Sequence, residues 1–296
     1  MSKALGQETA PTIMTTRRGP VEYAEYGEGP AVLALHGAMG GYDQSLLLAR
    51  TIGGPGYRYL ALSRPGYLGT PLSVARTPEA QADLLAEFLD LLKIDKAAVM
   101  AVSGGGPNAL HFGLRHPDRC WGLVLVSTCS RPVETNLPWA FHLMKLLART
   151  PAFGKMMRRR TEQNLEQAAG RSIQDPTLRA RALQDPEVRP LLEALTLSTS
   201  DRMGLRIAGT ENDVNITRTY NCPLEQLTVP ILVVHGTKDP LVPYATHAQS
   251  MAARVPGAQL VTLEGGEHTA IFSHRHEARA QVIQFLSEHA PVTSGA

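Results

Sequence analysis

The sequence predicts an α/β protein in which helices cover both faces of a mostly parallel sheet. Short apolar runs alternate with segments of helical periodicity along much of the 296-residue chain. These runs are almost wholly apolar, which is typical of strands buried on both faces. Glycine-rich loops follow several of them. Because ligand sites in such sheets collect at the carboxyl ends of the strands, these loops are where we expect the chemistry.

An opening hairpin is predicted over residues 13–26, where two strand-like segments flank the turn signal Arg18-Gly19-Pro20. Further strands are predicted at residues 31–35, 57–62, 97–102, 123–126, 231–234 and 260–263. Helices are predicted at residues 78–92, where leucines and Phe88 recur at helical spacing, and from Pro107 to His116, just before Pro117.

The alternation breaks between residues 131 and 222, where helical segments such as 139–148 and 190–197 replace the strands. We therefore expect a helical insertion at 131–222, with residues 1–130 and 223–296 forming the core. The segment 139–148 is more apolar than one helix face requires, so it packs against the core or lines a pocket. Trp139 in this segment is a candidate substrate contact.

The charge balance gives no reason to expect nucleic acid or an anionic membrane as a partner, because 29 Lys and Arg residues face 27 Asp and Glu. The basic run at residues 155–160 is interpreted as the solvated face of a helix. Cys120, Cys129 and Cys222 are odd in number and lack metal-ligand spacing, which indicates neither a disulfide framework nor a zinc site. No export signal or membrane span is visible, so we expect a cytoplasmic protein.

Ser103 stands out in the segment AVSGGGPNAL, residues 101–110, between an apolar strand and a predicted helix. This is the local pattern of a nucleophile elbow, whose strained turn needs small residues two positions before and after the serine. Ala101 and Gly105 meet that need, although alanine departs from the usual G-x-S-x-G. Alone, the turn is ambiguous, because an ordinary strand-to-helix loop or a phosphate cradle would show the same pattern.

Two later loops supply the partners that a nucleophilic serine requires, a histidine base and a carboxylate to orient it. Asp239 lies in HGTKDPLVP, just after the strand at 231–234, and His268 ends EGGEH, just after the strand at 260–263. The chain order Ser, Asp, His is the one that this architecture uses. The competing bases are His235, inside a strand end, and three histidines on predicted helices, His247, His274 and His276.

Acyl transfer also needs backbone N–H groups aimed at the developing oxyanion. The glycine-rich loop HGAMGG, residues 36–41, follows the strand at 31–35, and its Ala38 or Met39 N–H could pair with that of Gly104. A phosphate-binding loop is disfavoured, because the Walker lysine and the G-x-G-x-x-G order are both missing.

Five segments make the chain resemble the capped serine hydrolases of the α/β-hydrolase superfamily. They are HGAMGG from His36, SRPGYLGTP from Ser63, AVSGGGP from Ala101, HGTKDPLVP from His235 and GGEH from Gly265. The resemblance spans nearly the whole chain. It implies an eight-stranded sheet with one antiparallel strand near its start, a helical cap at 131–222 between the sixth and seventh strands, and catalytic roles for Ser103, Asp239 and His268.

The function expected from these residues is hydrolysis of a small or medium carboxylic ester through an acyl-enzyme, without metal or cofactor. Met39, Trp139 and Leu241 are the expected substrate contacts. A serine at position 103 argues against haloalkane dehalogenase and epoxide hydrolase chemistry, which in this superfamily uses an aspartate nucleophile. Beyond the ester substrate no partner is required, and a homodimer is left open.

Three alternatives stay open. The SGGGP and SRPGY segments also resemble proline iminopeptidase-like members, which need a cap carboxylate to hold the substrate amine; the available ones are Glu134, Glu162, Glu166, Glu193 and Asp201. Lactone or C–C bond hydrolysis would use the same serine site. The non-enzymatic alternative is a ligand receptor that retains the hydrolase fold.

Overall fold

The computed structural model describes residues 9–133, 145–148 and 150–291. Its eight strands form one sheet in the order β1-β2-β4-β3-β5-β6-β7-β8. Only β2 runs antiparallel to its neighbours β1 and β4, and every other pairing is parallel. The predicted eight-stranded sheet with one antiparallel strand near its start is confirmed. The strands are β1 (Thr12–Thr16), β2 (Gly19–Tyr26), β3 (Ala31–Leu35), β4 (Arg58–Leu62), β5 (Ala97–Val102), β6 (Cys120–Val126), β7 (Ile231–Gly236) and β8 (Gln259–Leu263).

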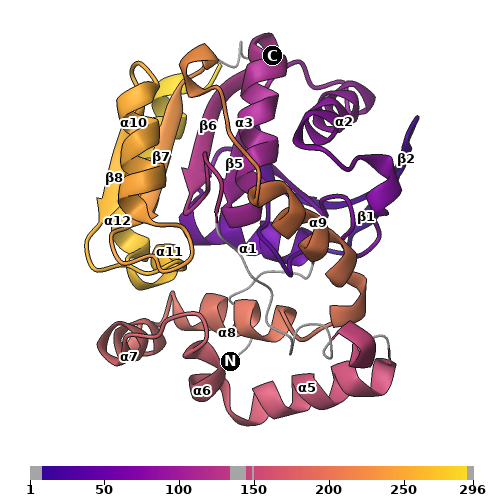
Figure 1. The fold of residues 1–296 in the computed structure, drawn as a ribbon, viewed down its shortest axis with the longest axis vertical. Helices are drawn as coiled ribbons and strands as arrows, with labels where there is room; N and C mark the ends of the chain where they lie inside the picture. The colour runs from indigo at the N-terminus through magenta and orange to yellow at the C-terminus, as the bar shows by residue number, and fades with distance from the viewer. Residues whose placement is uncertain (1–8, 134–144, 149, 292–296) are drawn as a thin grey trace.

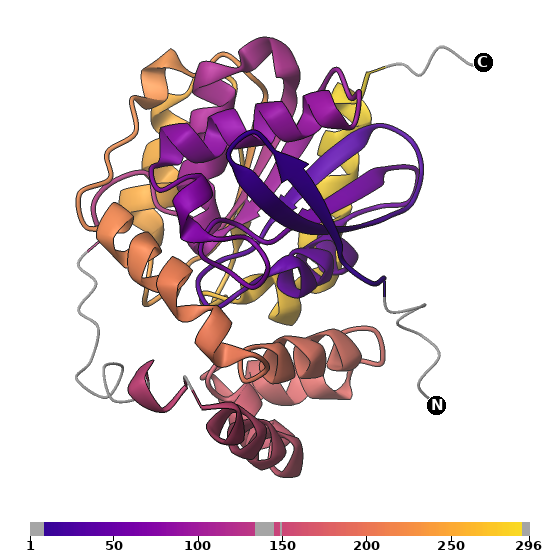
Figure 2. The ribbon, with the colours of Figure 1, turned by 90° about the vertical axis from the view of Figure 1, so that its right-hand side faces the viewer.

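Helices cover both faces of this sheet (Figures 1 and 2). One face packs against α2 (Pro78–Leu91), α3 (Gly106–Arg115) and α10 (Ser250–Arg254). The opposite face packs against α1 (Tyr42–Ile52) and α12 (Arg275–His289), and α11 (Ala270–Ser273) lies beside them. The predicted fold class, with helices on both faces, is therefore confirmed.

Side chains of the central strands alternate between the two apolar cores. In β3, Leu33 and Leu35 belong to the core beneath α2 and α3, whereas Val32 and Ala34 belong to the core beneath α1 and α12. All four are fully buried. Since successive strand residues point to opposite faces and both faces are covered, the sequence shows continuous apolar runs in place of an alternating pattern.

Element boundaries agree with the sequence to within a few residues, with one small correction. The turn between β1 and β2 is made by Arg17 and Arg18, because Gly19 and Pro20 already pair with β1. The helix predicted at 78–92 is α2, which the side chain of Thr77 caps by accepting the Ala80 N–H at 3.2 Å.

The segment between β6 and β7 is helical in its described part, and Figure 1 shows α5 to α8 as a layer of their own below the sheet. The helix predicted at 190–197 is α8, which packs on α1, while α7 packs on α11. Of the helix predicted at 139–148 only residues 145–148 are described, so Trp139 lies outside the described residues. The helices are α5 (Pro151–Gln163), α6 (Leu165–Ala169), α7 (Pro176–Gln184), α8 (Arg189–Ser198) and α9 (Ile207–Thr217).

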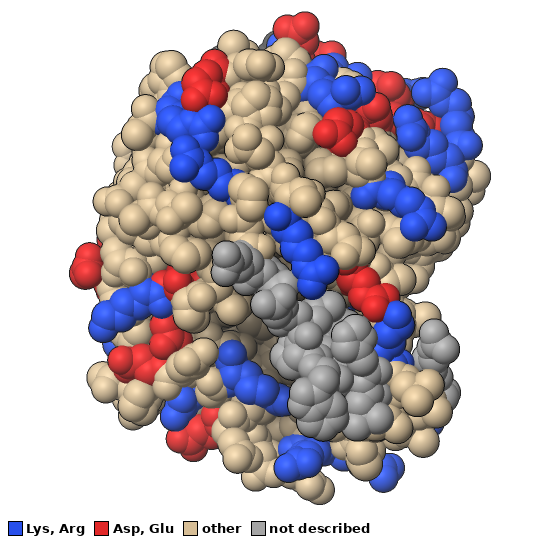
Figure 3. Space-filling model, viewed as in Figure 1, with Lys and Arg blue, Asp and Glu red and all other residues tan. Residues whose placement is uncertain are grey.

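The surface carries charges of both signs. Figure 3 shows Lys and Arg interspersed with Asp and Glu on the face that it displays. The basic run at 155–160 forms part of α5, where Arg158 pairs with Glu162 at 2.9 Å and both side chains are exposed. The three cysteines are buried and free. Within the described ranges, no helix is both long and apolar enough to cross a membrane.

Candidate active site

Ser103 occupies a strained turn between β5 and α3. Its φ of +51° lies in the left-handed region that non-glycine residues rarely adopt. A 3₁₀ turn over Ser103–Gly105 leads directly into α3. Thr128 donates its hydroxyl to the Ser103 carbonyl at 2.7 Å, which ties the turn to the end of β6. The serine is held by the surrounding structure in the conformation expected of a nucleophile elbow.

The small residues around Ser103 are explained by close packing. A Cβ at Gly105 would lie 2.7 Å from the His36 carbonyl oxygen. A Cβ at Gly106 would lie 1.5 Å from Thr128 Oγ1, so the third glycine of the run is required although the sequence pattern alone gave it no role. Ala101 is fully buried in the core beneath α2 and α3, which accommodates its methyl group at the position where the usual pattern has glycine.

The structure brings Ser103, His268 and Asp239 together from three different loops. His268 Nε2 lies 3.0 Å from Ser103 Oγ, and His268 Nδ1 lies 2.8 Å from Asp239 Oδ2. Because the carboxylate can only accept, we assign the ring proton to Nδ1, which leaves Nε2 free to accept the serine proton. This is the arrangement that a base-activated serine requires.

Asp239 is held in place by backbone and side-chain donors. Its Oδ1 accepts the N–H groups of Leu241 and Val242, both at 2.9 Å, and its side chain is fully buried. Burial by itself raises the pKa of Asp239. Hydrogen bonds from His235, His268 and Val242 outweigh that effect and hold the pKa well below its usual value. The carboxylate therefore stays ionised beside the His268 ring.

His235 is a residue whose place sequence reasoning missed. It was considered only as a competing base, yet it is fully buried behind Asp239. Its Nε2 lies 2.8 Å from the Val242 carbonyl oxygen and 3.2 Å from Asp239 Oδ2. Since both of these atoms are acceptors, Nε2 carries the proton and steadies the carboxylate from behind. The signal available in the sequence was the position of His235 at the end of a strand, only four residues before Asp239 in the loop that follows.

The other candidate bases have other partners. His247 Nδ1 lies 3.3 Å from the Ser130 amide nitrogen, His274 Nδ1 lies 2.9 Å from Ser273 Oγ, and His276 pairs with Asp185 at 2.8 Å. Only His268 is hydrogen-bonded to Ser103 among the described histidines. The geometry therefore favours His268, the residue chosen from the chain order, as the base beside Ser103.

The two expected oxyanion donors, Ala38 and Gly104, differ from Met39 in whether their backbone N–H already has an acceptor. Ala38 lines the cavity beside Ser103, and Gly104 lies in the first turn of the helical run, where N–H groups have no intrahelical acceptor. The Met39 N–H, by contrast, donates to Thr210 Oγ1 at 3.0 Å. Met39 as an alternative donor is therefore wrong, because its N–H already has an acceptor.

A cavity of about 440 Å³ opens beside Ser103 and His268. Leu241 lines it as expected, whereas Met39 is absent from the described lining and packs in an apolar cluster with Ala148, Met203 and Ile207. The structure therefore gives no support to Met39 as a substrate contact. The walls of this cavity are mainly apolar and include Leu47, Leu48, Val102, Leu195, Ile271 and Phe272.

Arg64, in the SRPG segment, is a second residue whose importance the sequence did not reveal. Its Nε donates to the His36 carbonyl at 2.8 Å and its Nη1 to the Gly104 carbonyl at 3.0 Å. Its buried charge is matched by Asp213 of α9, which also accepts the Tyr67 hydroxyl at 2.6 Å. One guanidinium thus connects the loop after β3 with the turn that carries Ser103.

Comparison with known proteins agrees with this geometry. The sequence profile of the alpha/beta hydrolase fold family matches residues 30–275, most of the chain. The chain belongs to the α/β-hydrolase fold family. As a hydrolase of this family it is similar to the solved alpha/beta hydrolase fold protein from Nakamurella multipartita, with 31% identity, a TM-score of 0.82 and coverage of 93% of this chain and 99% of that one.

Two curated relatives of this hydrolase carry more specific names. A pimeloyl-(acyl-carrier protein) methyl ester esterase from Aromatoleum aromaticum is 30% identical over 83% of this chain and 93% of its own length. A 2-hydroxy-6-oxononadienedioate/2-hydroxy-6-oxononatrienedioate hydrolase from Burkholderia vietnamiensis is 24% identical over 90% of both chains. The relatives thus include hydrolases named for different substrates.

Proposed function

We propose that the protein hydrolyses carboxylic esters through an acyl-enzyme on Ser103. The observation that carries this proposal is the chain of hydrogen bonds from Ser103 Oγ through His268 to Asp239, which begins at a strained turn beside an apolar-walled cavity. A similar relative is named as a methyl ester esterase, which supports the same bond type.

In the proposed cycle, His268 Nε2 accepts the Ser103 proton while Oγ attacks the ester carbonyl carbon. The N–H groups of Ala38 and Gly104 donate to the developing oxyanion. His268 then gives the proton to the leaving alcohol, which leaves an acyl group on Ser103. Water, activated by the same ring, attacks the acyl carbonyl and releases the acid. Asp239 stays ionised and keeps the His268 proton on Nδ1 throughout.

Within this class, Arg171 favours esters that carry an anionic group. This exposed arginine lines the cavity, and the only hydrogen bond of its guanidinium to the described residues is a long one of 3.5 Å to the Ala168 carbonyl. The one carboxylate in the described lining, Glu267, already accepts the N–H groups of Gln174 at 2.6 Å and Asp175 at 3.0 Å. Glu267 is thus held by backbone donors and makes no ion pair with Arg171 in the described residues, which leaves the Arg171 guanidinium available to an anionic group of a substrate.

An aminopeptidase is less well supported. Such an enzyme needs a free carboxylate in the cavity for the substrate amine, and Glu267 is engaged by backbone N–H groups. Glu162, Glu166, Glu193 and Asp201 are absent from the described lining, and Glu134 lies outside the described residues. Glu162 and Glu193 instead pair with arginines on their own helices.

The test compares wild type with Ser103→Ala on p-nitrophenyl esters and amino-acid arylamides. We expect ester turnover by the wild type that exceeds the variant by at least about 10³-fold, because the variant lacks the nucleophile. Arylamide turnover above ester turnover would favour the aminopeptidase. Equal rates for wild type and variant on every substrate would refute the proposed function and would favour the ligand receptor.

A further inference from the structure

We propose that the segment returning from the helical insertion to the core positions the oxyanion donors, with Arg206, Thr210 and Asp213 as positioning residues. The returning segment is defined as residues 203–217, a 3₁₀ turn at Met203–Leu205 followed by α9. The oxyanion loop is defined as residues 36–41, between β3 and α1. This inference rests on the proposed function, and it makes docking of the insertion a determinant of the chemical step.

Met39 is the point at which the two segments meet. It has a φ of +58°, a backbone conformation that is strained for a residue with a side chain. The returning segment holds it on both sides: Thr210 Oγ1 accepts the Met39 N–H at 3.0 Å, and Arg206 Nη1 lies 3.4 Å from the Met39 carbonyl oxygen. Gln44 of α1 adds a bond to the same carbonyl at 3.2 Å.

These contacts matter because Ala38, the proposed donor, is the residue directly before Met39. The peptide after Ala38 is fixed through the Met39 N–H by Thr210. The peptide before Gly37 is fixed through the His36 carbonyl by Arg64. The Ala38 N–H lies on the peptide between these two. His36 Nδ1 lies 2.6 Å from the Gly37 carbonyl oxygen of that peptide, so this contact and the two neighbouring peptides together set the direction of the Ala38 N–H. Thr210 therefore acts on the oxyanion donor without touching the substrate.

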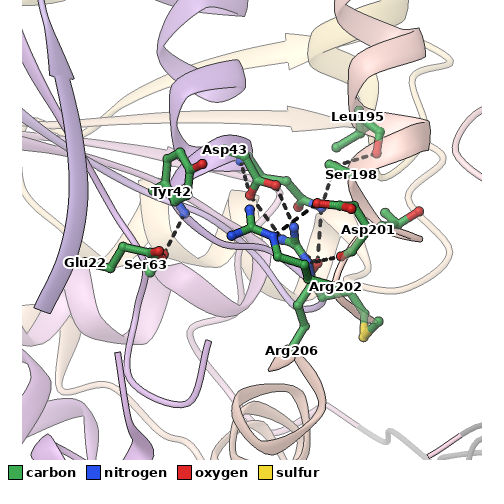
Figure 4. A network of polar contacts seen from close by, with 12 residues as sticks. Glu22, Tyr42, Asp43, Ser63, Leu195, Ser198, Asp201, Arg202 and Arg206 are labelled. Atoms are coloured by element: carbon green, nitrogen blue, oxygen red, sulfur yellow. Dashed lines mark hydrogen bonds and ion pairs between the residues drawn. The ribbon is translucent and has the colours of Figure 1, made fainter. Parts of the chain in front are cut away.

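An ion pair anchors the returning segment beside this loop. Arg206 is fully buried, and its guanidinium makes two bonds to the Asp43 carboxylate at 3.1 and 2.6 Å. Asp43 lies in the first turn of α1, two residues after the oxyanion loop. Figure 4 shows this pair together with Asp201, whose carbonyl accepts Arg206 Nε at 2.9 Å. The pairing sets the position of Arg206 relative to the Met39 carbonyl.

The second donor, Gly104, depends on the same segment through Arg64. The Gly104 carbonyl accepts from Arg64 Nη1, and the charge of Arg64 is balanced by Asp213, one helical turn after Thr210. The Gly209 N–H also donates to the Gly66 carbonyl at 2.9 Å, which docks α9 on the segment that carries Arg64. The returning segment is thus connected to the residues beside both proposed donors, directly at Met39 and through Arg64 at the Gly104 carbonyl.

Thr210 gives the sharpest test, because the chain offers a matched control. Thr196 in α8 is equally buried, at 4%, and its hydroxyl donates to the carbonyl four residues earlier, as that of Thr210 does. Only Thr210 also accepts a bond from the oxyanion loop. Thr210→Val removes that acceptor and keeps the shape, Thr210→Ser keeps the acceptor, and Thr196→Val reproduces the loss of a buried helix hydroxyl.

For ester hydrolysis we expect Thr210→Val to lower kcat by roughly 10- to 100-fold with KM within about threefold, as for a misplaced oxyanion donor. Thr210→Ser and Thr196→Val should keep kcat within about threefold of the wild type. The same ranking is expected for the affinity of a trifluoromethyl ketone, whose adduct places an oxyanion in the site. If Thr210→Val loses no more kcat than Thr196→Val, the positioning role is wrong.

Hydrogen–deuterium exchange of the peptide containing Met39 reads the same contact without substrate. We expect faster exchange at Met39 in Thr210→Val and unchanged exchange in Thr196→Val. Unchanged exchange in both variants would overturn the inference. Failure of the proposed function would be a different result, namely that wild type hydrolyses esters no faster than Ser103→Ala. In that case the exchange comparison still decides whether α9 positions the oxyanion loop.

Discussion

Asp213→Asn should lower the thermal stability of this protein by several degrees. The side chain accepts two bonds from Arg64 and one from the Tyr67 hydroxyl, and Arg64 and Asp213 are only 2% and 5% exposed. Asparagine nearly preserves the shape but removes the negative charge. Arg64 would then be a buried cation without a counter-charge, and breaking such a pair costs about 3–5 kcal/mol.

The expected shift in Tm follows from chain length. With about 2.1 cal/mol/K of unfolding entropy per residue, 296 residues give roughly 0.6 kcal/mol/K, so a loss of 3–5 kcal/mol lowers Tm by about 5–8 °C. The assay is thermal unfolding followed by circular dichroism at fixed protein concentration and pH.

Glu162→Gln is the matched control, because it breaks an arginine–carboxylate pair whose side chains are each 46% exposed. Exposed pairs contribute about 0–1 kcal/mol, so this variant should shift Tm by less than about 2 °C. If Asp213→Asn shifts Tm no more than Glu162→Gln, then Arg64 does not depend on Asp213 for its buried position.

The further predictions concern the carboxylate Asp239 and the cavity residue Arg171. Asp239→Asn should lower kcat about 10⁴-fold in the p-nitrophenyl ester assay, because the His268 ring loses the acceptor that fixes its tautomer. The folded-state pKa of Asp239 is depressed, so its contribution to stability is present above the unfolded pKa of about 4 and is lost as pH falls below that value. The difference in urea midpoint between wild type and Asp239→Asn should therefore shrink from pH 7 to pH 3. A difference that grows over this range would contradict the expected sign. Arg171→Gln should raise KM for a dicarboxylic acid monoester roughly two- to fivefold, as expected for an exposed ion pair, and leave KM for the neutral diester unchanged. Arg159→Gln, an exposed change on α5 away from the described cavity lining, should alter neither KM, and equal effects of the two variants would refute a role for Arg171.

The sheet was predictable because its signal is local and strong. Strands such as β3 and β5 are buried on both faces, so every residue in them is apolar, and the two cores impose this without reference to distant partners. Ser103, Asp239 and His268 were identifiable for a related reason: each lies in the loop or turn that follows a strand, and parallel strands bring their carboxyl ends to one edge. The α1 helix, which carries Asp43 and Gln44, was not predicted.

The contacts around the oxyanion loop were not predictable, because they join residues that are far apart in the sequence. Met39 was expected to donate to the oxyanion or touch substrate, but Thr210, 171 positions later, accepts its N–H. Arg64 meets Asp213 across 149 positions, and no periodicity or motif links them. Such pairings depend on where α9 docks, which local propensity does not determine.

The central claim is that Ser103 is the nucleophile, activated by His268. The most direct measurement is mass spectrometry of the protein after reaction with a serine-directed fluorophosphonate, with the modified peptide sequenced. We expect a single adduct on Ser103, no adduct in Ser103→Ala, and labelling of His268→Ala that is slower by at least about 10²-fold, because the base is lost. An adduct on another residue, or labelling of Ser103 at the same rate without His268, would contradict the account.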